Sequence, residues 1–284
     1  MTDSSTPETG GPHDMTATTD GQRLYAIGDI HGRSDLLSAM LARIRGDLAA
    51  RPHPAPRLIF LGDYVDRGPD SRGVIETLIA VQASEMPATF ILGNHDSYIE
   101  EYFRDPEWYD RSIHWLNPRM GGNTTLASYG VPDASEHDPT ATMEAFRAAF
   151  PAEHMAFLDG CDLQQQIGSY LFVHAGIRPG VRLDRQLRED LIWIREPFLS
   201  STRDFGVKVV HGHTIVETPE HHPNRIAIDT GAYASNLLTC LLLEDSTVAI
   251  LSEDGPAPLP PGAGLPEPAQ PAARNGLRDL FRRS

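Results

Sequence analysis

Residues 25–31 read Tyr-Ala-Ile-Gly-Asp-Ile-His and run directly into Gly32 and Arg33. The apolar start of this stretch is typical of a buried β-strand, and Asp29 and His31 follow it at once. Open α/β sheets build their sites at the carboxyl edge of the strands, because the loops that leave the strands converge there. The stretch therefore predicts an α/β fold with a carboxylate and an imidazole at the functional edge of a sheet.

The first third of the chain alternates between strand and helix patterns. Apolar runs at 58–61 and 88–92 predict two more strands, and helical periodicity runs through 36–48 and 74–81. The β-α-β-α-β order implies parallel strands joined by right-handed crossovers.

The middle and last thirds differ in character. Residues 105–160 are rich in aromatic side chains and show a helical pattern at 143–150. They predict a mostly helical insertion, either a cap beside the site or a plain structural subdomain. Short strand patterns between 162 and 251 are closely spaced, which predicts hairpins and a second, more antiparallel sheet. We expect one main folded domain over residues 23–252.

Both ends of the chain lack the apolar residues that a core requires. Residues 1–22 are polar, and 253–284 begin with a stretch rich in proline and alanine, so we expect two disordered tails. The last segment, 274–283, places three apolar residues among four arginines. It is expected either to dock a partner as a short basic amphipathic helix or to be a frayed basic tail.

The composition limits the classes of function. The chain has 284 residues, 40% of them hydrophobic, and a net charge of −15. Such acidity argues against a nucleic-acid binder or an anionic-membrane binder, since both need excess Lys and Arg. Cys161 and Cys240 have no CxxC spacing, so we expect free thiols rather than a disulfide. No apolar run is long enough for a signal peptide or a membrane span, and we expect a cytoplasmic protein.

Five blocks of sequence each place possible metal ligands after a predicted strand. Any one block could be ordinary turn chemistry or a histidine that merely satisfies a hydrogen bond. Together, carboxylate, amide and imidazole groups without cysteine are the ligand set of manganese, iron or zinc. They exceed what one ion needs, and two ions that share a carboxylate would use them. The candidates are Asp29, His31, Asp63, Asn94, His95, His174 and His213.

Three of these blocks resemble the signature motifs of a known family. Gly28-Asp-Ile-His-Gly32, Gly62-Asp-Tyr-Val-Asp-Arg-Gly68 and Gly93-Asn-His-Asp96 look like those of the phosphoprotein phosphatase family of bacterial type, within the calcineurin-like metallophosphoesterase superfamily. Phe172-Val-His-Ala-Gly176 and His211-Gly-His-Thr214 resemble its two later motifs. The resemblance spans residues 23–251 and implies an α/β fold of two facing mixed β-sheets flanked by helices, with metals at one edge.

The resemblance also implies the metal ligands. Asp29 and His31 would hold one ion, and Asp63 would bridge both. We expect Mn²⁺, with iron or zinc as alternatives, because these ligands accept several ions. His211 is expected to be structural rather than a ligand. The ligands that complete the second site would be Asn94, His174 and His213.

Further residues would act on the phosphate. A hydroxide that bridges the metals would attack phosphorus in line, and His95 would protonate the leaving oxygen. Asp66 would hydrogen-bond His95 and favour its protonated form. Arg67 would bind phosphate oxygens bidentately, and Arg195 resembles a second phosphate-binding arginine, with pairing to Glu196 as its alternative. The phosphate-binding set is Arg67, Arg195 and Asn94.

Two positions disagree about the substrate. Asp66 is typical of phosphoserine/phosphothreonine phosphatases, whereas bacterial diadenosine-tetraphosphate hydrolases usually have Ala there. Asp96 is typical of the dinucleotide hydrolases, whereas the protein phosphatases usually have Glu. We favour a protein-serine/threonine phosphatase acting on phosphoproteins or phosphopeptides, with symmetrical hydrolysis of diadenosine tetraphosphate as the alternative. A non-catalytic metal-bearing binding module is a third hypothesis, which the complete set of expected ligands disfavours.

Overall fold

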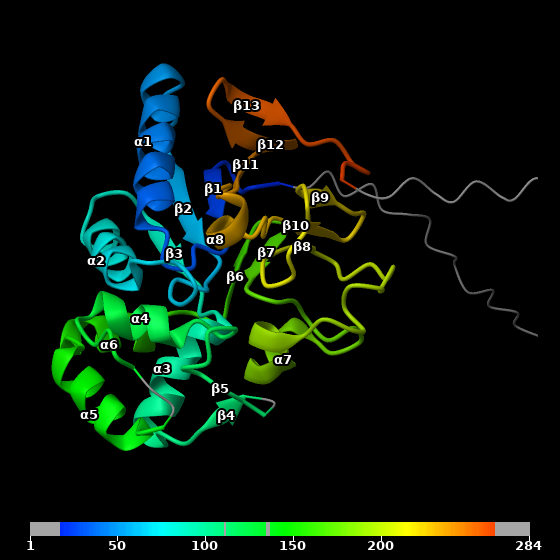
Figure 1. Ribbon diagram of the computed structural model, residues 1–284. Helices are drawn as coiled ribbons and strands as arrows, with labels where there is room; N and C mark the ends of the chain where they lie inside the picture. Colours follow the sequence, from blue (N-terminus) through cyan, green and yellow to red (C-terminus); the bar gives the residue numbers. More distant parts are fainter. Residues whose placement is uncertain (1–17, 111, 135–136, 265–284) are drawn as a thin grey trace, which may run out of the picture.

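The computed structural model describes residues 18–110, 112–134 and 137–264. Figure 1 shows two β-sheets with helices around them. The first sheet has the order β13-β12-β11-β1-β2-β3, and the β1–β2 and β2–β3 pairs are parallel. Its strands are β1 (Arg23–Ile27), β2 (Pro56–Phe60), β3 (Ala88–Phe90), β11 (Cys240–Glu244), β12 (Thr247–Ser252) and β13 (Gly255–Pro258).

The second sheet has the order β6-β7-β8-β10-β9, in which β7, β8 and β10 are parallel. The edge strands β6 and β9 pair antiparallel to their neighbours. Its strands are β6 (Gln164–Ile167), β7 (Tyr170–Val173), β8 (Lys208–His211), β9 (Glu220–His221) and β10 (Arg225–Ala227).

Alternation along β1 explains how the layers stack. Leu24 and Ala26 point into a cluster that also holds Phe172 and Val210 of the second sheet, so the two sheets face each other. Tyr25 and Ile27 point into the cluster under the helices. The expected fold class, two facing mixed sheets flanked by helices, is confirmed. The helices that flank the sheets are α1 (Ser34–Ala50), α2 (Ser71–Gln82), α3 (Asn94–Arg104), α7 (Arg188–Trp193) and α8 (Ala232–Ser235), with a 3₁₀ turn at Leu183–Arg185.

The described residues between 105 and 160 form three helices and one small hairpin, in the lower part of Figure 1. Helices α4 and α6 contact α2, and α5 contacts α3. The elements of this insertion are β4 (Tyr109–Asp110), β5 (Ile113–His114), α4 (Gly122–Ser128), α5 (Pro139–Ala149) and α6 (Ala152–Asp159). Within the described residues, no helix is both long enough and apolar enough to cross a membrane.

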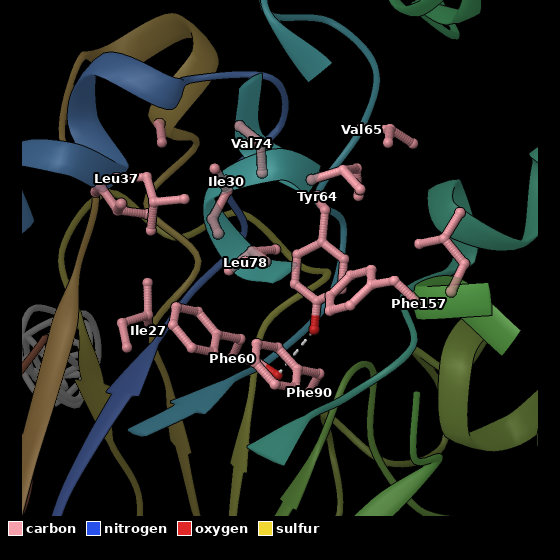
Figure 2. Packing of buried hydrophobic residues seen from close by; sticks show 14 of the residues in the cluster. Ile27, Ile30, Leu37, Phe60, Tyr64, Val65, Val74, Leu78, Phe90 and Phe157 are labelled. Atoms are coloured by element: carbon pink, nitrogen blue, oxygen red, sulfur yellow. Dashed lines mark hydrogen bonds between the residues drawn. The ribbon is translucent and has the colours of Figure 1, made fainter. Parts of the chain in front are cut away.

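The loop after β2 is held down by side chains that enter the core. Figure 2 shows Tyr64 beside Phe157, with its hydroxyl pointing toward Phe60. That hydroxyl donates to the carbonyl oxygen of Ile91 at 2.6 Å. Val65, the next residue, is also fully buried. Because Tyr64 and Val65 lie directly between Asp63 and Asp66, burying them fixes where those two carboxylates point.

The strands after residue 237 do not join the second sheet as expected, because β11 pairs antiparallel with β1 and extends the first sheet. Every residue of β1 is buried, and the apolar strand β11 covers the edge of β1 that does not pair with β2. Strand spacing alone predicts hairpins but does not say which sheet edge a hairpin joins.

The expected tails are partly structured. Thr19 is buried, and the backbone N–H of Gly168 donates to the carboxylate of Asp20 at 3.0 Å. Beyond residue 253, β13 pairs with β12 and Leu259 is buried, so the expected disorder is wrong for these residues. Proline-rich sequence still forms an edge strand, since only one side needs N–H donors. The basic segment 274–283 lies outside the described residues.

Candidate metal centre

The carboxyl ends of strands from both sheets open at one place. In the first sheet β1, β2 and β3 lead into Asp29, Asp63 and Asn94, and in the second sheet β7 and β8 lead into His174 and His213. Four of these five side chains line a cleft of about 450 Å³. The exception, His174, is completely buried beside Asn94. The two sheets therefore build one site together.

The loops at this cleft hold unusual backbone conformations. Among the described residues, nine non-glycine residues have positive φ; four of them line the cleft, and a fifth, Asp66, contacts His95 from behind it. Such conformations cost about 1–3 kcal/mol each and persist only where the surroundings enforce them. Strain of this kind clusters at functional sites, so it supports a functional role for these loops. The five residues are His31, Asp63, Asp66, Arg67 and His213.

Asp63 lies between two groups of possible ligands. Its Oδ2 is 3.4 Å from Nε2 of His31, and its Oδ1 is 3.4 Å from Nε2 of His174. In one group Asp63 lies with His31 and His95, and in the other with His174 and His213, each with ligand atoms within 4.8 Å of one another. A carboxylate shared between two groups is the arrangement of two-metal hydrolases.

The histidine tautomers suit metal binding. Nδ1 of His31 donates to the carbonyl oxygen of Val65, and Nδ1 of His174 donates to that of Leu61, both at 2.8 Å. Because Nδ1 carries the proton, Nε2 of each ring presents a lone pair. Nε2 of His174 is also 3.0 Å from Oδ1 of Asn94. Lone pairs that face oxygen atoms repel each other, and a cation between them would remove that repulsion.

Burial keeps these imidazoles neutral, the form that binds a metal. It lowers the pKa of His31 to about 3 and that of His213, aided by His174 and Arg195, to about 2. Nε2 of His213 is buried and has no hydrogen-bond partner among the described residues. This nitrogen therefore has a free lone pair that fits a bound metal ion.

Asp29 stands outside the two groups but lines the same cleft. Burial, with repulsion from Asp229 and Asp63, raises its pKa well above the usual range. Its Oδ2 accepts from the backbone N–H of His213 at 3.0 Å, while its Oδ1 is buried without a partner. Three carboxylates that converge in this way fit divalent cations, which would offset their charge.

His95 and Asp66 form a buried pair at the edge of the centre. Nδ1 of His95 lies 2.6 Å from Oδ2 of Asp66, and the backbone N–H of His95 donates to Oδ1 of Asp63 at 2.9 Å. Burial alone would lower the pKa of His95, but Asp63 and Asp66 outweigh it and the pKa is raised. The arrangement suits a proton donor that faces the cleft.

Arg67 is held over the cleft by two partners. Its Nη2 lies 3.1 Å from Nε2 of His95, and its Nη1 donates to the hydroxyl of Tyr233 at 2.9 Å. The guanidinium also lies 4.9 Å from the centre of the Tyr233 ring. Tyr233 escaped the sequence reasoning, because the short helix α8 carries no motif and lies far along the chain.

Another part of the cleft wall comes from the end of α7, the residues that follow it and the loop after β8. Arg195 lines the cleft and its Nη2 donates to the carbonyl oxygen of His213 at 3.4 Å. Trp193 and Ile215 add apolar surface, and Ile215 is 54% exposed. The cleft thus combines cationic, metal-ligating and apolar surface.

Two residues singled out from the sequence have structural surroundings. The carboxylate of Asp96 accepts from the backbone N–H groups of Gly93 at 2.9 Å and Tyr64 at 2.8 Å. It therefore caps α3 and holds the loop after β2. His211 bonds through Nδ1 to the carbonyl of Gly212 and through Nε2 to Arg225. Neither lines the cleft.

Two curated proteins illustrate what this chain is similar to in sequence. The "Bis(5'-nucleosyl)-tetraphosphatase PrpE [asymmetrical]" of Anoxybacillus flavithermus is 29% identical over 246 residues, which cover 80% of this chain and 93% of the relative. The "Bis(5'-nucleosyl)-tetraphosphatase, symmetrical" of Methylococcus capsulatus is 33% identical over 156 residues, 55% of this chain and 44% of the relative.

Solved structures support the fold. A protein described as a candidate diadenosine tetraphosphatase superposes with a TM-score of 0.56 at 19% identity, covering 84% of this chain and 94% of its own. A cold-active protein tyrosine phosphatase gives 0.57 at 18% identity, covering 90% and 85%. The family model for calcineurin-like phosphoesterases matches residues 22–239. This chain belongs to the calcineurin-like phosphoesterase family.

Proposed function

We propose that the protein is a metal-dependent hydrolase of bis(5'-nucleosyl) tetraphosphates. The observation that carries the proposal is the similarity to relatives with that name over 93–94% of their own length. It rests on a cleft that combines possible metal ligands with phosphate-binding arginines. The dinucleotide substrate of the alternative weighed in the sequence analysis is therefore preferred over phosphoproteins, whereas the symmetrical cleavage expected there differs from the asymmetrical cleavage that the names of these relatives state.

The residues divide into two metal sites in this proposal. Asp29 and His31 would hold one ion and Asp63 both, with Mn²⁺ the expected metal. Two bound divalent ions would supply a nucleophile near neutral pH and neutralise phosphate charge. The ligands of the other site would be Asn94, His174 and His213.

The remaining residues of the cleft would bind and orient the substrate. Arg67 and Arg195 line the cleft beside the metal ligands, where their guanidinium groups would hold phosphate oxygens. Asn94 would bind phosphate as well as metal. Trp193 and Ile215 offer an apolar wall of the kind that accepts a nucleobase.

The structure bears on Asp66 and Asp96, the two residues that indicate different substrates in the sequence analysis. Asp96 bonds only to backbone N–H groups of its own neighbourhood, so it says nothing about the substrate. Asp66 still favours a phosphatase, because its short hydrogen bond to His95 suits a histidine that acts as a proton donor. A proton donor is most useful with a poor leaving group, which makes phosphomonoester hydrolysis the second candidate function.

A side-by-side assay with Mn²⁺ tests the proposal. Diadenosine tetraphosphate is compared with phosphoserine, phosphothreonine and phosphotyrosine peptides, and nucleotide products are separated by chromatography. We expect the dinucleotide to be cleaved with the highest kcat/KM, giving ATP and AMP as the word asymmetrical in the names of these two relatives implies. Two ADP molecules would indicate symmetrical cleavage. A preference for the phosphopeptides would favour the second candidate and contradict the first.

A further inference from the structure

The helical insertion reaches the loop that carries Asp66 and Arg67. Trp115, just after the β4–β5 hairpin, donates its indole N–H to Oδ2 of Asp66 at 2.8 Å. Thr125, on α4, donates its hydroxyl to Oδ1 of the same carboxylate at 2.7 Å. The backbone N–H of Arg67 donates to the carbonyl of Gly121 at 3.3 Å. Three points of the insertion thus touch two consecutive residues of the site.

These contacts fix the carboxylate of Asp66 from both sides. Asp66 is completely buried, and a buried carboxylate needs hydrogen-bond donors. Oδ2 accepts hydrogen bonds from the indole N–H of Trp115 and from Nδ1 of His95, whereas Oδ1 accepts one from the hydroxyl of Thr125. The hydroxyl of Thr125 also accepts from the backbone N–H of Asp66 at 2.9 Å. The side chain therefore has one orientation, in which Oδ2 faces the histidine.

The turn before α4 allows this close approach. A Cβ atom on Gly122 would lie 2.6 Å from the indole ring of Trp115. Gly121 has a φ of +94°, and a Cβ there would lie 2.4 Å from the backbone nitrogen of Arg67. Two side-chain-bearing residues in this turn would push the insertion away from Asp66.

We propose that Trp115 and Thr125 are positioning residues for proton donation by His95. They hold the carboxylate of Asp66, which in turn fixes the imidazole so that Nδ1–H donates to Asp66 and Nε2 is the nitrogen that would donate its proton in the cleft. The inference rests on the proposed phosphoester hydrolysis, and it assigns the insertion a task in that reaction. It differs from a purely structural role, which the packing of Trp115 against Tyr102 and Phe146 would allow.

Matched substitutions separate the two roles. Trp115→Phe keeps an aromatic ring and removes the N–H donor, and Thr125→Val removes the hydroxyl at nearly constant volume. Thr125→Ser keeps the hydroxyl and should restore activity. Tyr129→Phe is the control, because it removes a buried hydrogen bond of the insertion, to His154 at 2.8 Å, without touching Asp66.

The kinetic readout is the dependence on the leaving group. With Mn²⁺ bound, Trp115→Phe and Thr125→Val should lower kcat about tenfold for an alkyl phosphate and less than threefold for p-nitrophenyl phosphate. KM and metal content should stay unchanged, and adding His95→Asn to Trp115→Phe should cause no loss beyond that of His95→Asn alone. Equal losses on both esters, or additive losses in the double variant, would overturn the inference.

The second readout is independent of turnover. In the metal-free protein, the NMR resonance of the His95 Nδ1 proton reports its hydrogen bond to Asp66. It should shift in Trp115→Phe and Thr125→Val and stay in place in Tyr129→Phe and Thr125→Ser. An unchanged resonance in the first two variants would overturn the inference. A wild-type enzyme that leaves diadenosine tetraphosphate intact refutes the proposed substrate instead, and the NMR comparison still decides this inference.

Discussion

Asp63→Asn should abolish the stabilisation of the protein by metal while leaving the metal-free fold intact. The amide oxygen of Asn can still accept the backbone N–H of His95, as Oδ1 of Asp63 does at 2.9 Å. The new amide N–H₂ would face Nε2 of His31, which lies 3.4 Å from Oδ2 and can accept a hydrogen bond. The substitution also removes one of the charges that repel Asp29.

The size of the effect follows from linkage between binding and folding. An ion present at 100 times its Kd stabilises the folded state by about 2.7 kcal/mol. For a domain of this size, 1 kcal/mol corresponds to about 2–4 °C in Tm, so Mn²⁺ should raise the Tm of the wild type by about 5–11 °C. Asp63→Asn should lose most of this rise, because both groups of ligands share its carboxylate.

The assay is thermal unfolding of both proteins after chelation and again with added Mn²⁺. Asp47→Asn is the matched control, since Asp47 is another buried carboxylate, bonded to the hydroxyl of Tyr25 at 2.6 Å and outside the cleft. It should lower Tm equally with and without Mn²⁺. A full Mn²⁺-induced rise in Asp63→Asn would refute the shared-ligand reasoning.

Three further predictions concern single side chains. His95→Asn should reduce kcat by about 10²–10⁴-fold on alkyl phosphates and far less on activated aryl phosphates; equal losses in steady-state kinetics would argue for a role in positioning only. Tyr64→Phe should lower the free energy of unfolding by about 1–2 kcal/mol in urea titrations, because the carbonyl of Ile91 loses a buried donor; an unchanged value would contradict this. Tyr233→Phe keeps the ring over Arg67 but removes its hydroxyl acceptor, so KM should rise while metal content stays constant; a loss of metal instead would place Tyr233 among the metal-site residues.

Local patterns predicted the parts of the fold that depend on local sequence. The strand that ends before Asp29 and the helices that follow it carry apolar periodicity strong enough to place them. The pairing of β11 with β1 was not predictable in the same way, since it joins Cys240 to Ile27 across most of the chain. What decides it is the need to cover a buried strand edge, which only the assembled fold reveals.

The candidate site was likewise predictable only where its residues lie in local sequence patterns. The possible metal ligands could be named because their residue types follow predicted strands in a known order. The residues that hold Asp66 and Arg67 could not be predicted, since Trp115, Thr125 and Tyr233 reach the site from loops and helices without any motif. Asp96 was misleading for a physical reason, as its carboxylate faces backbone N–H groups rather than a ligand. The substrate depends on such contacts, and similarity to relatives carries that part of the proposal.

The central claim is a pair of metal ions that share Asp63, and anomalous diffraction from crystals grown with Mn²⁺ tests it most directly. The account predicts two peaks about 3.5–4 Å apart, one on each side of the Asp63 carboxylate. One should lie beside Asp29 and His31, and the other beside His174 and His213. A single peak, or two peaks that do not both contact Asp63, would contradict it.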